Sequence, residues 1–231
     1  MFKKYWKFFV IFWSVVLVGI IGVFVFFWLI SAGKLGFMPT FEELENPNNR
    51  FASEVYFADG PIMNRYFEKE NRKYIEYREI PQSVIDALIA TEDVRFYDHS
   101  GVDVRGLFRV AKGLLTANTS AGGGSTISQQ LAKMLFPRES DLNVFELAIR
   151  KFREWVIAVR LEKSYTKEEI LTMYLNKYDF LNLAVGISSA ADIYFQVPLD
   201  SLKVEQAAML IGMAKNSSYY NSVRRPELTL N

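Results

Sequence analysis

The sequence predicts a mostly helical domain that follows one transmembrane helix and a small β element. Three observations support this fold class. An uncharged apolar run extends from Phe8 to Ile30, β-favouring runs flank a turn near residue 60, and apolar residues recur at helical spacing from Pro81 onward. We therefore divide the 231 residues into a cytoplasmic tip with its anchor (1–31), a linker with short strands (32–79) and the main domain (80–231).

Composition narrows the chemistry but not the partner. Lys and Arg number 27 and Asp and Glu number 26, so the charge of the whole chain indicates no class of ligand. The absence of cysteine excludes thiol catalysis, disulfides and thiolate metal sites.

The run from Phe8 to Ile30 predicts an uncleaved membrane anchor. A helix of this length spans roughly 34 Å, which is enough to cross a hydrocarbon core of about 30 Å. A cleavable signal peptide is the alternative, but its apolar core is only about 7–15 residues long and ends at a small-x-small site that is missing here. Lys3, Lys4 and Lys7 precede the run and only Lys34 follows closely, which predicts a cytoplasmic N-terminus with the rest of the chain outside.

The linker predicts a small β element. The runs Ser53–Phe57 and Asn64–Phe67 flank the turn signal Ala58-Asp59-Gly60-Pro61. The segment Lys73–Arg78 alternates in polarity like a third short strand.

The main domain predicts a succession of helices, several of which are bounded by capping or breaking residues. Thr166 and Glu169 form a capping box at the start of one helix. Pro137 ends another, the helix that starts at Ser125 or Thr126. The expected helices run from Pro81 to about Glu92, from Asp103 to about Thr116, from Ser125 or Thr126 to about Phe136, over Ser140–Ser164, from Thr166, over Gly186–Phe195 and over Val204–Lys215.

Glu92 is the first candidate for chemistry, because it lies at the C-terminal end of an apolar helix. The negative end of the helix dipole and partial desolvation both make a carboxylate a better proton acceptor. This is what a general base requires. The alternative is a solvated glutamate that pairs with Arg95 one turn later.

The stretch Gly122-Gly123-Gly124-Ser125-Thr126 opens a helix and predicts an anion-binding turn, in which free backbone N–H groups point at phosphate oxygens. It is not a nucleotide P-loop, because no Lys-Ser or Lys-Thr follows the last glycine. A flexible surface loop is the alternative. Gln129 and Lys133 lie one helical turn apart and favour the anion site.

The helix predicted at Ser140–Ser164 has two faces. Phe145, Phe152 and the aliphatic residues between and after them form one apolar stripe, and Glu154 lies on the opposite side with Arg150 and Lys151. A solvated, salt-bridged face is the alternative interpretation. Between Arg105 and Lys163, basic residues outnumber acidic ones two to one, which favours a phosphate or anionic headgroup as ligand.

Four motifs in order resemble the peptidoglycan glycosyltransferases, the family 51 domain of class A penicillin-binding proteins and monofunctional transglycosylases. The resemblance covers about Ile80 to Lys215. The motifs are Glu92-Asp93-x-x-Phe96-x-x-His99-x-Gly101, Gly124-Ser125-Thr126-Ile127-x-Gln129-Gln130 through Lys133, Arg150-Lys151-x-x-Glu154, and Lys167-x-x-Ile170-Leu171-x-x-Tyr174-Leu175-Asn176.

The resemblance implies a lysozyme-like helical fold and the polymerisation of lipid II into glycan strands by inverting transfer, with release of undecaprenyl diphosphate. It makes Glu92 the general base on the acceptor 4-hydroxyl. Glu154 would assist on the donor side, through the diphosphate, a bound cation or the orientation of nearby cations.

The resemblance also implies a set of substrate-binding side chains. Those expected to neutralise the diphosphate are Lys133, Arg150 and Lys151, with Arg109 and Arg138 as weaker candidates. Those expected to line or shape the cleft are Ser125, Thr126, Gln129, Gln130, Phe96 and His99.

The implied partners are lipid II, the growing lipid-linked glycan chain, membrane lipid and cell-wall synthesis proteins, with no nucleic acid. The implied cofactor is a divalent cation, Mg²⁺ or Mn²⁺, at the diphosphate, to which the sequence assigns no ligands. The implied location is the inner cell membrane, with a single span and the catalytic domain on the periplasmic side. Apolar residues near 114–124 and Met134-Leu135-Phe136 are expected to enter the membrane.

The sequence departs from the family pattern in two places. The last motif, Arg-Arg-x-x-Val-Leu, is not found after Arg224-Arg225, which predicts a fragment that lacks the end of the domain and a following transpeptidase domain. The glycine expected after Phe180 is replaced by Leu181, which predicts a different local geometry.

Two other functions remain open from the sequence. A muramidase-like enzyme would use one carboxylate as an acid on finished glycan and would need neither the cations nor the anchor. A catalytically silent scaffold would bind lipid-linked precursor without turnover, and the presence of Glu92 and Glu154 speaks against it. Consumption of lipid II, cleavage of glycan or neither separates the three functions.

Overall fold

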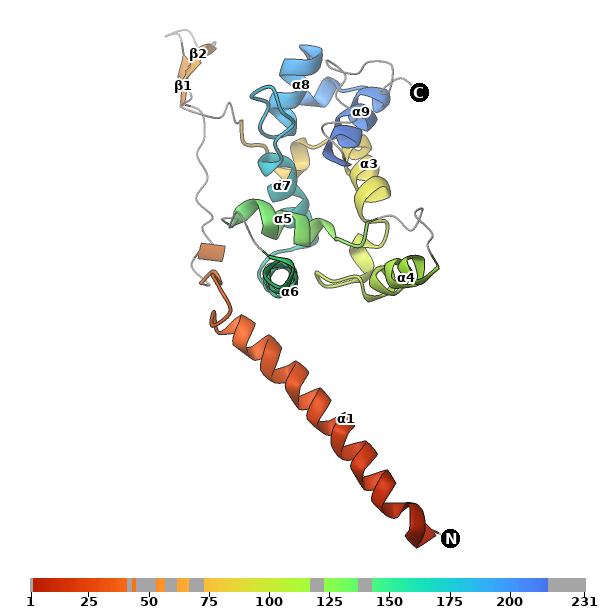
Figure 1. The fold of residues 1–231 in the computed structure, drawn as a ribbon. Helices are drawn as coiled ribbons and strands as arrows, with labels where there is room; N and C mark the ends of the chain where they lie inside the picture. The colour runs from red at the N-terminus through yellow and green to blue at the C-terminus, as the bar shows by residue number, and fades with distance from the viewer. Residues whose placement is uncertain are drawn as a thin grey trace.

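The computed structural model describes residues 2–40, 43–44, 53–56, 62–66, 73–116, 123–136 and 143–215. This part of the chain is mostly helical, as predicted, and one long N-terminal helix extends away from a compact group of shorter ones (Figure 1). The helices are α1 (Phe2–Ser31), α3 (Gln82–Glu92), α4 (Val104–Leu115), α5 (Ile127–Leu135), α6 (Val144–Ser164), α7 (Lys167–Lys177), α8 (Ile187–Phe195) and α9 (Val204–Lys215).

The linker contains two paired strands. β1 (Ser53–Tyr56) and β2 (Ile62–Tyr66) are antiparallel, and the pairing is irregular between Val55 and Tyr56. The third strand predicted at Lys73–Arg78 is wrong, because residues 73–76 are irregular and a single 3-10 turn follows. Asn176 of α7 explains the difference. Its Oδ1 accepts from the Ile75 N–H at 3.0 Å and its Nδ2 donates to the Ile75 carbonyl at 2.9 Å, so one side chain occupies both groups that a strand partner would need.

The helices begin at capping residues, several of which the sequence predicts. The Thr126 hydroxyl accepts from the Gln129 N–H at the start of α5, and Thr166 forms the predicted capping box with Glu169 at the start of α7. In α6 the capping box is made by Asn143, so the described helix begins at Val144, and the start predicted at Ser140 lies outside the described residues.

The core of the domain is one cluster of apolar side chains shared by six helices, α3 and α5 to α9. α3 packs against α9, and α5 packs against both α6 and α7. Burial of these side chains removes apolar surface from water, which is the main favourable contribution to folding. The fully buried members include Leu88, Leu131, Leu161, Leu171, Tyr174 and Leu210.

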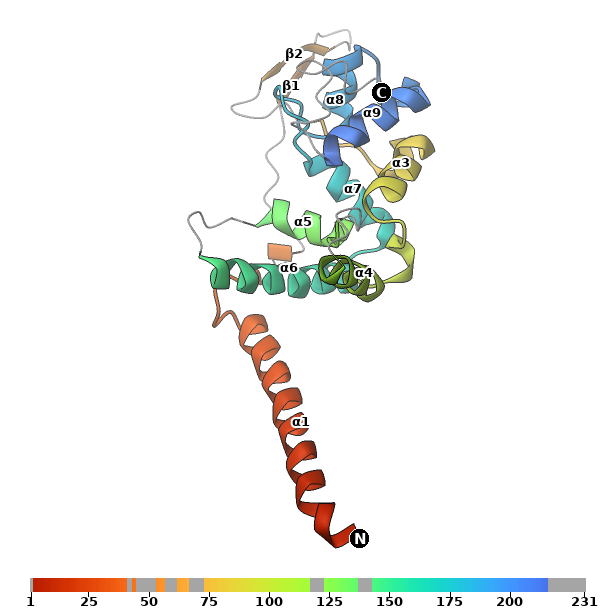
Figure 2. The same ribbon diagram turned by 45° about the vertical axis from the view of Figure 1, so that its right-hand side comes forward.

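The C-terminal end of α1 docks on α6 (Figures 1 and 2). The Phe152 ring makes edge-to-face contacts with Phe26 and Phe27 at centroid distances of 5.3 and 5.7 Å. About two turns further along α6, the Arg160 guanidinium donates to the Ser31 carbonyl at 2.9 Å and to the Pro39 carbonyl at 3.1 Å. The chain that leaves α1 is therefore fixed to α6 by ring contacts and hydrogen bonds.

This docking corrects the prediction for the apolar stripe of α6. Phe152 faces α1, and Phe145 is 71% exposed, so the stripe does not form the core face of the helix. The core-facing residues of α6 are Ile157, Ala158 and Leu161. The stripe was misassigned because helical spacing identifies an apolar face but not the element that covers it.

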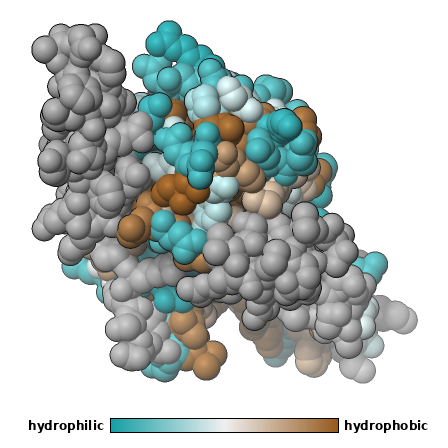
Figure 3. All heavy atoms as spheres, turned by 90° about the horizontal axis from the view of Figure 1, so that it is seen from above, coloured by the Kyte–Doolittle hydropathy of each residue, from teal (hydrophilic) through white to brown (hydrophobic). Residues whose placement is uncertain are grey.

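In the described part of the chain, α1 is the one helix long and apolar enough to cross a membrane, over Tyr5–Ser31. Most of its large apolar side chains are exposed. The face of the molecule at the top of Figure 1 differs from α1 in the polarity of its surface. There, hydrophilic side chains alternate with smaller apolar patches in the part that is not grey (Figure 3).

Candidate active site

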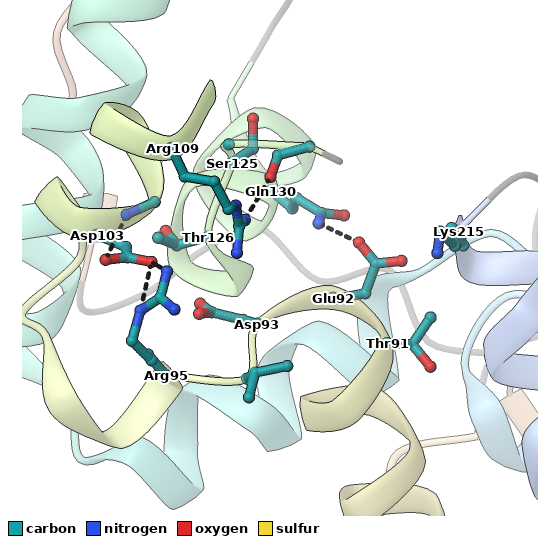
Figure 4. Close-up of a pocket in the computed structure, with 14 residues that line it drawn as sticks. Thr91, Glu92, Asp93, Arg95, Asp103, Arg109, Ser125, Thr126, Gln130 and Lys215 are labelled. Carbon is teal, nitrogen blue, oxygen red and sulfur yellow. Dashed lines mark hydrogen bonds and ion pairs between the residues drawn. The ribbon is translucent and has the colours of Figure 1, made fainter. Parts of the chain in front are cut away.

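A cleft of about 550 Å³ opens between the end of α3, the start of α4, the glycine-rich loop, α5 and the end of α9 (Figure 4). Charged and small polar side chains dominate its wall. The lining residues are Thr91, Glu92, Asp93, Val94, Arg95, Asp103, Gly106, Arg109, Gly123, Gly124, Ser125, Thr126, Gln130 and Lys215.

Glu92 is the last residue of α3 and projects into the cleft (Figure 4). Its Oε2 accepts a hydrogen bond of 2.6 Å from Gln130 Nε2. Its Oε1 is buried and has no hydrogen-bond partner among the described residues. The hydrogen bond from Gln130 thus fixes the orientation of the Glu92 carboxylate at the cleft wall.

Asp93 and His99 hold the two walls of the cleft together. The Asp93 carboxylate accepts from the Ile127 N–H at 3.1 Å and from His99 Nε2 at 3.0 Å. The Gly101 N–H donates to His99 Nδ1, so Nε2 carries the ring proton. Because Ile127 is the first residue of α5, this network fixes α5 against the end of α3 and brings Gln130 to Glu92.

Phe96 and His99 do not reach the substrate side of the site, which corrects their assignment as binding residues. Phe96 is completely buried, and Lys167 Nζ lies 4.2 Å from its ring centroid. The His99 side chain is only 7% exposed and points at Asp93. Both side chains pack within the segment that follows Glu92.

Gln129 also faces inward rather than into the cleft. It is 1% exposed, and its Nε2 donates to the Gly101 carbonyl at 3.1 Å. Successive residues of a helix point about 100° apart, so Gln130 faces the cleft while Gln129 faces the segment that contains Gly101. Lys133 is exposed one turn further along α5 and is not part of the cleft wall.

A second pair of charged groups adjoins the cleft from α6. Lys151 Nζ donates to Glu154 Oε2 and to Ser125 Oγ, each at 2.9 Å. Ser125 is a lining residue, so it connects the pair to the cleft. The Glu154 side chain is 12% exposed, and Arg150 is half-buried next to Lys151 in the chain.

The α4 side contributes Arg109 and a well-defined ion pair. Arg109 Nη2 donates to the Gly123 carbonyl at 3.4 Å and lies over the cleft (Figure 4). Arg95 Nε donates to Asp103 Oδ2 at 3.1 Å. This hydrogen bond lowers the pKa of the Asp103 carboxyl below its usual value. Arg138 lies outside the described residues.

The family follows from the comparison with known proteins. Residues 59–231 match the protein family described as "Transglycosylase". The chain belongs to the transglycosylase family.

Curated relatives of this transglycosylase are much longer proteins. It is 36% identical over 190 residues to penicillin-binding protein 1A of Neisseria lactamica, which covers 82% of this chain and 23% of the relative. It is 37% identical to penicillin-binding protein 1A of Escherichia coli over 184 residues, which covers 80% of this chain and 21% of the relative. The matched stretch is therefore less than a quarter of each relative.

Several cleft residues of the transglycosylase were not predicted as site residues, among them Arg95, Asp103 and Lys215. Lys215, at the end of α9, lies on the side of Glu92 opposite Gln130 (Figure 4). The sequence contains no signal for it beyond a basic residue in the last turn of a predicted helix. Its position depends on how α9 packs on α3, which is a tertiary contact.

The described residues offer no ligand set for a divalent cation. No group of three or more His, Cys, Asp or Glu side chains in this part of the transglycosylase could hold a metal ion. We therefore derive no step of the reaction from the cation that the resemblance implies.

Proposed function

We propose that the chain polymerises lipid II into peptidoglycan glycan strands by inverting glycosyl transfer. The observation that carries the proposal is Glu92, whose carboxylate is held by Gln130 at the wall of a cleft that is also lined by Arg109 and Lys215. Membership of the transglycosylase family supports the same class of reaction.

In the proposed reaction Glu92 acts as general base. Its carboxylate takes the proton from the 4-hydroxyl of the acceptor sugar while the hydroxyl oxygen forms a bond to the anomeric carbon of the lipid-linked donor. The bond from the anomeric carbon to the diphosphate oxygen breaks on the opposite side, so the configuration inverts. Undecaprenyl diphosphate leaves with the bonding electrons.

The leaving group gains negative charge, so cations near it stabilise the transition state more than the ground state. Lys151 and Arg109 are the best placed, because Lys151 reaches the cleft wall through Ser125 and Arg109 lies over the glycine-rich loop. Glu154 Oε2 accepts a hydrogen bond from the Lys151 ammonium at 2.9 Å. In the proposal, the role of Glu154 is therefore to orient this cation. Lys133 and Arg150, which the sequence predicts as main diphosphate contacts, do not line the cleft and become weaker candidates, as Arg138 already was.

The proposal includes the arrangement at the membrane. We infer that α1 crosses the inner membrane with its N-terminus in the cytoplasm and the domain on the periplasmic side, where lipid II is consumed. The basic residues before the apolar run support this orientation. Because the chain has no cysteine, single cysteines at Lys4 and Val204 provide the test. A membrane-impermeant maleimide applied to spheroplasts is expected to label Val204→Cys and not Lys4→Cys, and the reverse pattern contradicts the orientation.

The reaction is tested with labelled lipid II in detergent and three proteins: wild type, Glu92→Gln and the exposed control Glu205→Gln. Loss of the general base is expected to slow glycan formation by a factor on the order of 10²–10⁴. The control is expected to match wild type, and all three proteins are expected to unfold at similar temperatures. Equal activity of Glu92→Gln and wild type would remove Glu92 from the mechanism. Cleavage of finished glycan by wild type would instead support the muramidase-like alternative, and binding of lipid II without turnover would support a scaffold.

A further inference from the structure

A buried tyrosine lies behind the hydrogen bond that holds Glu92. Tyr174 is in the middle of α7 and is completely buried. Its hydroxyl donates to Gln130 Oε1 at 3.1 Å, and Gln130 Nε2 donates to Glu92 Oε2 at 2.6 Å. The three side chains form one line of hydrogen bonds from the core to the cleft.

The hydrogen bonds run from donor to acceptor in one direction, from Tyr174 through Gln130 to Glu92, and this fixes the orientation of the Gln130 amide. An amide has one carbonyl end and one NH₂ end, and only the NH₂ end can donate to a carboxylate. With Tyr174 donating to the carbonyl end, both ends of the amide are satisfied when Nε2 faces Glu92. A flipped amide would turn its carbonyl oxygen toward the Glu92 carboxylate and leave the tyrosine proton without its acceptor.

The protonation of Tyr174 is secured by its surroundings. Burial, together with the negative charge of Glu92, raises the pKa of the Tyr174 hydroxyl well above its usual value. The hydroxyl therefore keeps its proton over the working pH range and remains a donor.

We infer that Tyr174 is a positioning residue for the proposed reaction, because it orients Gln130 so that Gln130 holds the Glu92 carboxylate in place for the acceptor hydroxyl. Tyr174 does not line the cleft, so it acts through Gln130 and touches no reacting atom. The inference rests on the proposed role of Glu92 as general base.

The test compares Tyr174→Phe with wild type in the lipid II assay. Without the hydroxyl, the Gln130 carbonyl is partly buried without its donor, and the amide is free to turn. We expect kcat to fall roughly tenfold, as for the loss of one hydrogen bond to a charged group, with KM for lipid II unchanged. The acid limb of the pH–rate profile should move to higher pH, because Glu92 loses the N–H that stabilises its negative charge.

Other titratable groups near Glu92 are the same in both proteins. They are Asp93 beside it in the chain, Lys215 on α9 and Arg109 across the cleft. A shift of the profile in the Tyr174→Phe variant alone is therefore due to the line of hydrogen bonds.

Two further variants separate positioning from a loss of structure. Tyr194→Phe removes another partly buried tyrosine hydroxyl, which donates to the Phe180 carbonyl at 2.6 Å far from the cleft wall, and it should leave kcat and the pH profile unchanged. In a Gln130→Ala background, Tyr174→Phe should have no further effect on kcat, because the intermediary is already missing.

An equal loss of kcat in the wild-type and Gln130→Ala backgrounds overturns the inference, as does an unchanged kcat in both. These outcomes are distinct from failure of the proposed function. If Glu92→Gln is inactive and Tyr174→Phe is fully active, only the inference fails, whereas an active Glu92→Gln removes the general base itself.

Discussion

Three consecutive residues between α7 and α8 have left-handed backbone conformations. Leu181, Asn182 and Leu183 have φ values of 66°, 51° and 68°. Residues with a Cβ pay roughly 1–2 kcal/mol each in this region, whereas glycine does not. This part of the chain therefore adopts left-handed conformations without a glycine, and a geometry that differs from the family pattern stays a prediction. The turn has backbone conformations that glycine adopts more easily, so it is strained. Hydrogen bonds such as the one from the Leu181 N–H to Asp179 Oδ1 stabilise it.

Replacement of Leu183 by glycine should therefore stabilise the protein. This side chain is 59% exposed, so little packing is lost. We expect a gain of about 1 kcal/mol, reduced by the greater flexibility of glycine in the unfolded chain. Thermal unfolding in detergent measures it. Val204→Gly, at an exposed position in the first turn of α9, is the control and should be destabilising. A lower melting temperature for Leu183→Gly would show that the turn carries no strain.

The Asp103 carboxylate gives a prediction for pH dependence. Its pKa is lowered in the folded protein by the hydrogen bond from Arg95. The pair therefore stabilises the fold above about pH 4, and the stabilisation is lost as the pH falls through the folded-state pKa. Asp103→Asn should be less stable than wild type at pH 7 in urea unfolding, and the difference should shrink toward pH 3. Asparagine can still accept from the Gly106 N–H, so the cap of α4 is kept. A difference that does not change with pH would contradict this account.

At the residue scale, the sequence indicates which residues gather but not which way they point. Glu92 and Gln130 meet in the cleft, as their motifs predict. Gln129 points into the loop instead, because Thr126 caps α5 and sets the rotation of the helix. Lys215 comes from the far end of the chain, and only packing brings it to Glu92. The chemical roles of these residues remain predictions until the activity assays are done.

Among the elements, α5, α6 and α7 are joined by a mostly buried ion pair below the site. Lys167 Nζ, on α7, lies 2.7 Å from Glu162 Oε2 on α6 and donates to the His99 carbonyl at 2.7 Å. Ser128 of α5 donates to the same glutamate. The Glu162 side chain is only 4% exposed, so Lys167 and Ser128 take the place of water around it.

Loss of Lys167 alone should be costly. Lys167→Met leaves the Glu162 carboxylate buried without its counter-ion, which we expect to destabilise the protein by about 3 kcal/mol. The double variant Glu162→Gln/Lys167→Met removes both charges and should recover part of this loss. Denaturant unfolding of the three proteins checks the order of stability. A double variant less stable than Lys167→Met would mean that the pair is not the cause.

The helices themselves are predictable because their boundaries have local causes. Thr126, Thr166 and Pro137 mark ends that capping chemistry explains from a few neighbouring residues. The stripe of α6 was misassigned because its partner is α1, more than a hundred residues earlier. The supposed third strand near Ile75 fails for the same reason, since its backbone is paired by Asn176 from α7.

For the whole molecule, the important contact is the one between the anchor and the domain. Phe152 and Arg160 on α6 hold the end of α1 and the residues that follow it. α6 is also the helix that carries Lys151 and Glu154. The helix that contacts α1 therefore also carries the residues proposed for the donor side of the site.

The rigidity of the contact between α1 and α6 can be measured with spin labels, because the chain has no native cysteine. Labels at Val10→Cys on α1 and Val204→Cys on α9 should give a narrow distance distribution. Adding Phe152→Ala and Arg160→Ala should broaden it, since both contacts with α1 are lost. Glu205→Ala, on the exposed side of α9, is the control. A distribution that is already broad without the α6 changes would show that the anchor moves independently.

The docked anchor has a consequence for the lipid around it. A flexible tether would let the domain keep its height in bilayers of any thickness, but a fixed helix cannot. When the hydrocarbon core becomes thinner or thicker than the apolar length of α1, the helix must tilt or the bilayer must deform. Because α6 follows α1, such a tilt would turn the mouth of the cleft relative to the headgroups. We therefore expect glycan synthesis in vesicles to peak at one acyl-chain length, and the peak to flatten when Phe152 and Arg160 are replaced by alanine.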